Sequence, residues 1–203
     1  MRGTTAADAP HVYGTLETML TKEELADLAP ERLRPLYRRE YEKLIEAGVF
    51  EDENVELLNG ILFAMSPQGD AHAWISSRLH ELLLLALQGR VEVRGDSSFP
   101  ATEDSMPEPD VQVIPRTATW PHPERAFLMI EVSVSSLAKD RRIKTGIYAR
   151  SGVPEYWIVD VEGEAIEVYT NPREGAYEQM ERIGRGSSIR LVLFPDVEIV
   201  VDD

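Results

Sequence analysis

The feature that most constrains the fold is an apolar run at residues 127–134, in which Glu131 is the only charged residue. A short run without regular polar alternation is typical of a strand buried on both faces, as in sheets that helices cover on both sides. We therefore predict that this run forms a strand near the middle of the sheet of an α/β domain.

The rest of the chain shows helix and strand patterns in mixed order. Asn59 and Gly60 lie between two apolar segments and predict a tight hairpin turn, because both residues tolerate positive φ angles. Thr21, with Glu24 three residues later, has the pattern of a helix N-cap. Apolar spacing predicts helices at 30–48, 72–88 and 139–150, and further strands at 91–93, 97–99, 110–114, 156–160, 165–169, 177–182, 189–194 and 197–201. This order predicts a mixed β-sheet flanked by helices.

Length and composition limit the class of protein. The chain of 203 residues has the size of a single domain. We assign residues 1–20, which lack periodicity, to a flexible arm and residues 21–203 to the domain. The sequence contains no Cys, which excludes disulfides and thiolate metal ligands. Neither a membrane-spanning run nor a signal-peptide pattern is visible, so we expect a cytoplasmic protein without a membrane partner.

The formal net charge of −15 opposes one class of function. Proteins bind nucleic acid largely through Lys and Arg side chains that neutralise phosphates, so this chain should be repelled at long range. Binding of nucleic acid would then require a local basic patch or a bound cation.

Glu131 is the first candidate functional residue. An ionised carboxylate in a buried strand is costly unless a cation or hydrogen-bond donors compensate it. A structural salt bridge with Lys144 or Arg142 is an equally good explanation of the sequence pattern. Strand alternation predicts that three neighbours share its face: Phe127, Met129 and Ser133.

Asp110 is the second candidate, at the start of another predicted strand. An Asp after Pro109 is often simple turn chemistry. If its strand lies beside that of Glu131, however, the two carboxylates converge on one patch. Such a pair either raises one pKa or attracts a hard cation such as Mg²⁺.

Lys144 supplies the positive charge in the predicted helix that follows Glu131. Asp140, Lys144 and Tyr148 recur every fourth residue and share one stripe of that helix. A solvated ion pair between Asp140 and Lys144 would explain this spacing without any function. The functional interpretation requires the helix to pack back over the sheet.

Several short motifs also follow one another in a fixed order between residues 55 and 160. They are 55–60, Met65-Ser66-Pro67 with His72, 109–111, 130–133, Asp140 with Lys144 and Tyr148, and 151–157. This ordered set resembles the Uma family, which belongs to the PD-(D/E)XK nuclease superfamily, and implies a restriction-endonuclease-like fold. Two positions depart from the family pattern. Asn59 stands where Asp is expected, and Ser133 occupies the lysine position of the E-x-K motif.

The resemblance implies a role for each matched residue. Asp110 and Glu131 would bind Mg²⁺ or Mn²⁺ with help from the Val132 carbonyl. Lys144 would replace the lysine missing at Ser133 and orient or deprotonate the attacking water. Glu56 would be a further ligand, directly or through water, although a cross-strand pair in the hairpin would also account for it. His72 could donate a hydrogen bond to one of these ligands, but a surface or capping role is more common near a helix start. A packing role explains Tyr148, and both residues stay outside this set.

The sequence thus predicts a Mg²⁺-dependent endonuclease that hydrolyses nucleic acid, with DNA favoured over RNA. The C-terminal strands could support a homodimer, because nucleases that cut two strands often need two active sites. Two alternatives remain. The domain could be a catalytically inert module that binds nucleic acid or protein, which the acidic charge and Ser133 favour, or a purely structural partner subunit.

Overall fold

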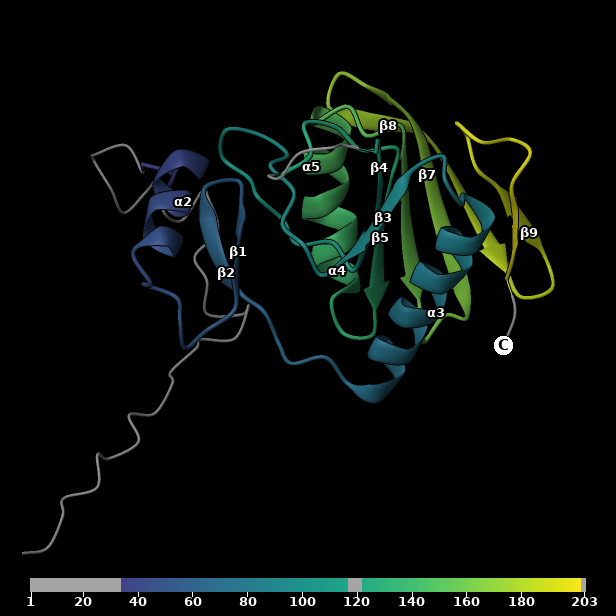
Figure 1. Ribbon diagram of the computed structural model, residues 1–203, viewed down its shortest axis with the longest axis horizontal. Helices are drawn as coiled ribbons and strands as arrows, with labels where there is room; N and C mark the ends of the chain where they lie inside the picture. The colour runs from purple at the N-terminus through teal and green to yellow at the C-terminus, as the bar shows by residue number, and fades with distance from the viewer. Residues whose placement is uncertain (1–33, 117–121, 202–203) are drawn as a thin grey trace, which may run out of the picture. The chain divides into compact units, whose positions relative to one another are not determined.

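A six-stranded mixed sheet is the largest sheet among the described residues (Figure 1), with the strand order β3-β4-β5-β6-β7-β8. β5 and β6 are parallel, and the other neighbouring strands are antiparallel. All residues of β5 are buried and β5 has a partner strand on each side, which confirms the prediction for residues 127–134. The strands are β3 (Glu92–Gly95), β4 (Val111–Ile114), β5 (Leu128–Ser133), β6 (Glu155–Asp160), β7 (Ala165–Arg173) and β8 (Ala176–Gly184).

This computed structural model describes residues 34–116 and 122–201. The unit that carries the sheet extends over Pro35–Asp203. The predicted arm at residues 1–20 and the predicted N-cap at Thr21 lie outside the described residues. The boundary between arm and domain therefore stays a prediction.

The predicted hairpin is present as β1 (Val55–Leu58) and β2 (Ile61–Ala64). Leu58 pairs with Ile61, so Asn59 and Gly60 form a two-residue turn. Their φ angles are 50° and 78°, which is the left-handed geometry that a type I′ turn requires. The local sequence was therefore sufficient to predict this element.

The helices agree with the predicted ones apart from their ends. α2 (Arg38–Glu46) begins later than predicted, because Tyr37 is its N-cap and the Glu40 carboxylate accepts a hydrogen bond from Tyr37 N. α3 (Asp70–Ala86) confirms the second predicted helix. The third is a continuous helical segment made of α4 (Leu137–Lys139), a π-helical turn η2 (Asp140–Lys144) and α5 (Thr145–Arg150). The π-helical turn has no counterpart in the prediction.

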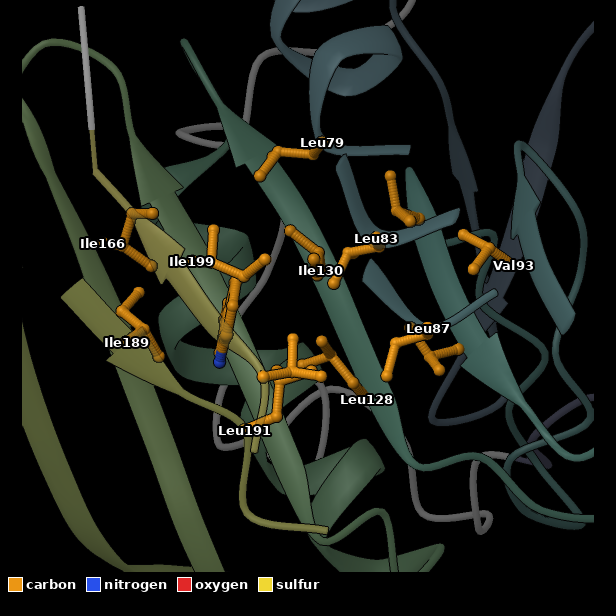
Figure 2. Packing of buried hydrophobic residues seen from close by; sticks show 14 of the residues in the cluster. Leu79, Leu83, Leu87, Val93, Leu128, Ile130, Ile166, Ile189, Leu191 and Ile199 are labelled. Carbon is orange, nitrogen blue, oxygen red and sulfur yellow. The ribbon is translucent and has the colours of Figure 1, made fainter. Parts of the chain in front are cut away.

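Helices cover both faces of the sheet. On one face, Leu79, Leu83 and Leu87 of the α3 region pack against the sheet (Figure 2). The short hairpin of β9 (Ser188–Arg190) and β10 (Glu198–Val200) packs into the same cluster. On the other face, Tyr148 of α5 packs against β5 and β6. The sheet therefore lies between two layers, and every residue in its central strand must be apolar or compensated.

Several strand details differ from the prediction. β9 ends at Arg190, although the predicted strand extended to residue 194. No strand forms at 97–99, because Asp96 has a φ of 42° and turns the chain out of the sheet. Phe127 packs in the cluster with α3 rather than on the face of Met129. Phe127 and Leu128 both oppose Val113, as in a β-bulge, and this interrupts the alternation. β7 and β8 form a hairpin that is longer than the two predicted strands.

Within residues 34–116 and 122–201, no helix has the length and apolar character needed to span a membrane.

Candidate active site

Asp110 and Glu131 face each other across neighbouring strands. Val111 pairs with Ile130, so the residue before β4, Asp110, lies opposite Glu131 when the register is continued. Asp110 Oδ2 accepts a hydrogen bond of 2.6 Å from the backbone N–H of Val132. The pairing of β4 with β5 thus brings the two carboxylates to one end of these strands, which meets the condition that the sequence analysis set for their convergence.

Lys144 reaches these carboxylates from the helical layer. Its Nζ lies 2.9 Å from Glu131 Oε2 and 3.0 Å from Glu56 Oε2. The Lys144 side chain is only 3% exposed. The alternative of a solvated pair with Asp140 is therefore wrong, whereas the buried salt bridge between Glu131 and Lys144 is present.

Glu56 enters the site from β1. It lies opposite Phe63 in the hairpin, so a cross-strand charge pair does not account for it. Its Oε1 lies 2.6 Å from Lys139 Nζ, and its Oε2 accepts from Lys144 and, at 3.4 Å, from the Glu108 backbone N–H. The hairpin thus contributes a buried carboxylate held between two ammonium groups.

Two residues left outside the predicted site also contact it. His72, in the first turn of α3, places Nε2 at 3.1 Å from Asp110 Oδ2. Tyr148 of α5 donates a hydrogen bond of 2.7 Å to Glu131 Oε1. The four-residue spacing of Lys144 and Tyr148 indicated the contact of Tyr148 with Glu131, because residues four apart share one face of a helix. Nothing in the spacing of His72 indicated its contact with Asp110.

Burial and charge shift the protonation equilibria of the cluster. Burial raises the pKa of Glu131 well above its ordinary value; Lys144 opposes this shift, and the carboxylates of Asp140 and Asp110 add to it. Burial alone would lower the pKa of Lys144, but Glu131 and Glu56 outweigh it and raise that pKa. Lys144 therefore keeps its positive charge at neutral pH.

The pKa of Glu56 is shifted in the opposite direction from that of Glu131. Burial would raise its pKa, but the ammonium groups of Lys144 and Lys139 hold it below the ordinary value. The pKa of His72 is raised, chiefly by its hydrogen bond to Asp110. The cluster therefore combines one carboxylate that is held ionised with another, Glu131, that is costly to ionise.

The candidate ligand atoms are oxygens, which are the ligands that a small hard cation prefers. Among the described residues, no three acidic or His side chains are grouped closely enough to hold a metal ion by themselves. The oxygen donors at the end of the β4–β5 pair are the carboxylates of Asp110 and Glu131 and the Val132 carbonyl. That carbonyl points toward the same neighbouring strand as the Val132 N–H. Mg²⁺ commonly binds one or two carboxylates and keeps several waters, so this set matches its preference.

The same fold occurs in a crystal structure described as "a putative nuclease belonging to DUF820" from Anabaena variabilis ATCC 29413. The two chains are 16% identical, the match covers 82% of this chain and 96% of that one, and the TM-score is 0.64. This likeness shows that the two proteins share their fold, a mixed α/β sheet flanked by helices.

The Uma2 family, whose description reads "Putative restriction endonuclease", matches residues 38–202. The match extends over most of the chain, and the chain therefore belongs to this family. No curated protein matches the sequence. The predicted family and fold are confirmed, and the family description supports a nuclease-like function.

Proposed function

We propose that this protein is a metal-dependent endonuclease that hydrolyses phosphodiester bonds in nucleic acid, with DNA as the favoured substrate. The observation that carries the proposal is the approach of Lys144 to Glu131, at 2.9 Å, beside the Asp110 carboxylate. The usual lysine position of the motif is occupied by Ser133, which carries no charge. Lys144 instead brings an ammonium group to Glu131 from the helical layer.

In this proposal Asp110, Glu131 and the Val132 carbonyl hold Mg²⁺ or Mn²⁺. When bound, the ion lowers the pKa of a water molecule and polarises a phosphoryl oxygen. Asp110 is oriented for this task by the Val132 N–H and His72, and Glu131 by Tyr148. These hydrogen bonds limit the rotation of both carboxylates before substrate arrives.

Lys144 acts as a hydrogen-bond donor and a source of positive charge. Its raised pKa supports a role in orienting the attacking water and offsetting charge on the phosphate, rather than in deprotonating the water. Both oxygens of Glu56 accept from ammonium groups, so we assign Glu56 to contact with the ion through water and to the placement of Lys144.

The proposal is tested by cleavage of supercoiled plasmid in Mn²⁺ or Mg²⁺. We expect Asp110→Asn and Glu131→Gln to lower the cleavage rate at least ~100-fold, beyond the range usual for outer partners of a metal site. Glu155→Gln is the matched control, because Glu155 is also a buried carboxylate of the sheet but contacts Trp157 and Val192 instead. Equal activity of all three variants and the wild type would exclude this site.

A catalytically inert binding module is the second candidate, and one observation favours it. Both oxygens of Glu131 are already engaged, by Lys144 and by Tyr148, in a chain with a net charge of −15. Calorimetric titration with Mn²⁺ separates the two candidates. The endonuclease requires binding that Asp110→Asn weakens, whereas the inert module predicts no binding by either protein.

We further propose that the protein acts in the cytoplasm and that double-strand cleavage requires a homodimer. The absence of Cys is compatible with a reducing compartment. Sedimentation of the protein with bound substrate tests the dimer, and a monomer that cuts both strands would contradict it.

A further inference from the structure

Lys144 is the last residue of a π-helical turn, η2, in an otherwise α-helical segment. The turn is closed by a hydrogen bond from Thr145 N to Asp140 O, across five residues. Such turns are rare, and they are frequent at functional sites. The first two residues of η2, Asp140 and Arg141, both form side-chain contacts with the sheet.

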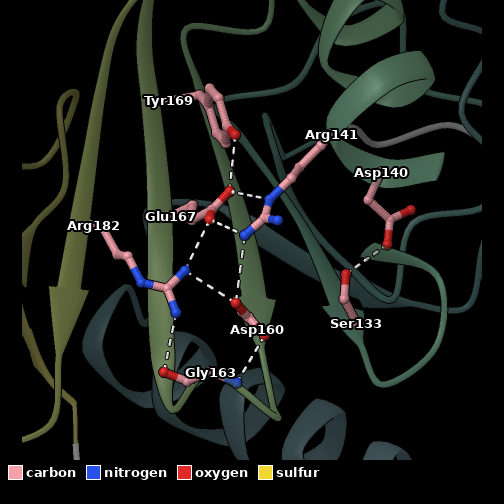
Figure 3. A network of polar contacts seen from close by, with 8 residues as sticks. All are labelled: Ser133, Asp140, Arg141, Asp160, Gly163, Glu167, Tyr169 and Arg182. Atoms are coloured by element: carbon pink, nitrogen blue, oxygen red, sulfur yellow. Dashed lines mark hydrogen bonds and ion pairs between the residues drawn. The ribbon is translucent and has the colours of Figure 1, made fainter. Parts of the chain in front are cut away.

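The first contact joins Asp140 to β5. Asp140 is buried, and its Oδ2 accepts hydrogen bonds of 2.6 Å from both Ser133 Oγ and Ser136 Oγ. Figure 3 shows Ser133 on the strand pointing at the Asp140 carboxylate. Ser133 is the residue at the usual lysine position, two residues after Glu131. Ser133 thus forms a hydrogen bond with the first residue of the turn that carries Lys144.

The second contact joins Arg141 to β6 and β7. The Arg141 guanidinium donates to both carboxylate oxygens of Glu167, with its Nε at 3.0 Å from Oε2, and lies 3.4 Å from Asp160 Oδ2 (Figure 3). Tyr169 donates to Glu167 as well. Two consecutive residues therefore fix η2 to three neighbouring strands.

We propose that Arg141 is a positioning residue which, together with Asp140, holds the π-helical turn against the sheet and so places the Lys144 ammonium at Glu131. Arg141 lies three residues before Lys144 and contacts neither Glu131 nor Glu56 in any described interaction. Its effect on Lys144 is therefore transmitted through the backbone of η2. The consequence for cleavage rests on the proposed function, but the placement of Lys144 does not.

Arg182 provides a matched control within the same network. It contacts the same two carboxylates, at 3.0 Å from Asp160 Oδ2 and 2.9 Å from Glu167 Oε1. The Arg182 and Arg141 side chains are 41% and 40% exposed. Arg182 belongs to β8, however, and does not tether the helical segment. Loss of either arginine removes similar charge contacts, and only loss of Arg141 releases η2.

The test measures the accessibility of Lys144 by reductive methylation and mass spectrometry, without metal or nucleic acid. The chain has four lysines, at positions 22, 43, 139 and 144. Lys43 is exposed and provides the reference rate within each sample. We expect Arg141→Met to raise the labelling of Lys144 relative to Lys43 about 10-fold through local opening, and Arg182→Met to change it less than about 2-fold.

The inference is overturned if Lys144 labelling is unchanged in Arg141→Met, or rises equally in Arg182→Met. Thermal unfolding checks that both variants are folded. If Arg141→Met does not fold, Arg141→Gln and Arg182→Gln are compared under the same two criteria. In the cleavage assay we expect Arg141→Met to lower the rate while the affinity for Mn²⁺ stays unchanged. A wild type that fails to cleave would contradict the proposed function alone, because the labelling result does not depend on it.

Discussion

The buried charges of this protein are understandable only as a set. Glu131 interrupts an apolar strand, and its burial is compensated by the Lys144 ammonium and the Tyr148 hydroxyl. Lys144 in turn is held between Glu131 and Glu56. Removing a single member of such a set leaves the others as uncompensated buried charges, which costs more than the pair itself contributes.

Lys144→Met should therefore destabilise the protein by about 3–5 kcal/mol, since Glu131 and Glu56 lose their shared cation. Adding Glu131→Gln should recover part of this loss, because the amide needs no counter-charge. Equilibrium unfolding in urea measures both effects. A loss below about 1 kcal/mol in Lys144→Met, the range of an exposed pair, would contradict the described burial of the cluster.

His72 acts on the proposed metal site through Asp110. Its Nε2 lies 3.1 Å from the carboxylate that we assign to the ion. Loss of such an outer partner typically weakens metal binding 10- to 100-fold. We expect that range, roughly, for His72→Ala in Mn²⁺ titrations, and no change for His80→Ala on the same helix. Equal affinities for the two variants would limit His72 to a structural role.

Among the elements, the β1–β2 hairpin contributes to the site through Glu56, which β1 carries. Its turn depends on Gly60, whose φ is 78° and whose added Cβ would lie 2.3 Å from Pro35 Cβ. The turn is therefore restricted twice, by backbone conformation and by packing. A side chain at this position must move either the hairpin or the segment that precedes α2.

Gly60→Ala and Gly89→Ala separate these two restrictions. Gly89 also has a φ of 78°, but nothing lies within 4 Å of its added Cβ. We expect Gly89→Ala to cost about 1–2 kcal/mol from the left-handed conformation alone. Gly60→Ala should cost clearly more in the same denaturation assay, with a parallel loss of cleavage through Glu56. Equal losses of stability in the two variants would show that Pro35 moves aside without a measurable free-energy cost.

For the molecule as a whole, stability should depend on pH through the carboxylates of the arginine network. Burial would raise the pKa of Asp160, but the Gly163 N–H and Arg182 outweigh it and lower that pKa. The pKa of Glu167 is likewise lowered, by Arg141 and Tyr169 against burial. A carboxylate with a lowered folded pKa stabilises the protein above its unfolded pKa, and this contribution is lost as the pH falls through the folded value.

The stability difference between wild type and Arg182→Gln should therefore be largest above about pH 5 and should shrink toward about pH 3. Urea unfolding across this range gives the difference directly. Because both arginines are partly exposed, the effect should also fall at high salt. A difference that stays constant with pH would mean that Arg182 contributes packing and not charge.

Much of the fold could be predicted from local patterns. The apolar run at 127–134 indicated a central strand, and Asn59-Gly60 indicated the hairpin, because burial and turn geometry depend on neighbouring residues in the chain. Phe127 was placed on the wrong face, since a bulge opposite Val113 depends on the partner strand. The missing strand at 97–99 has a similar cause in the turn at Asp96.

The sequence by itself determined which chemical groups are present: carboxylates at Asp110 and Glu131, a lysine in the following helix, and no lysine at Ser133. Only the tertiary structure decided how these groups meet. The pairing of β4 with β5 aligns the carboxylates, the π-helical turn directs Lys144 inward, and α3 adds His72. These contacts join residues far apart in the chain, and their geometry follows from the packing of whole elements, which a local sequence pattern does not contain.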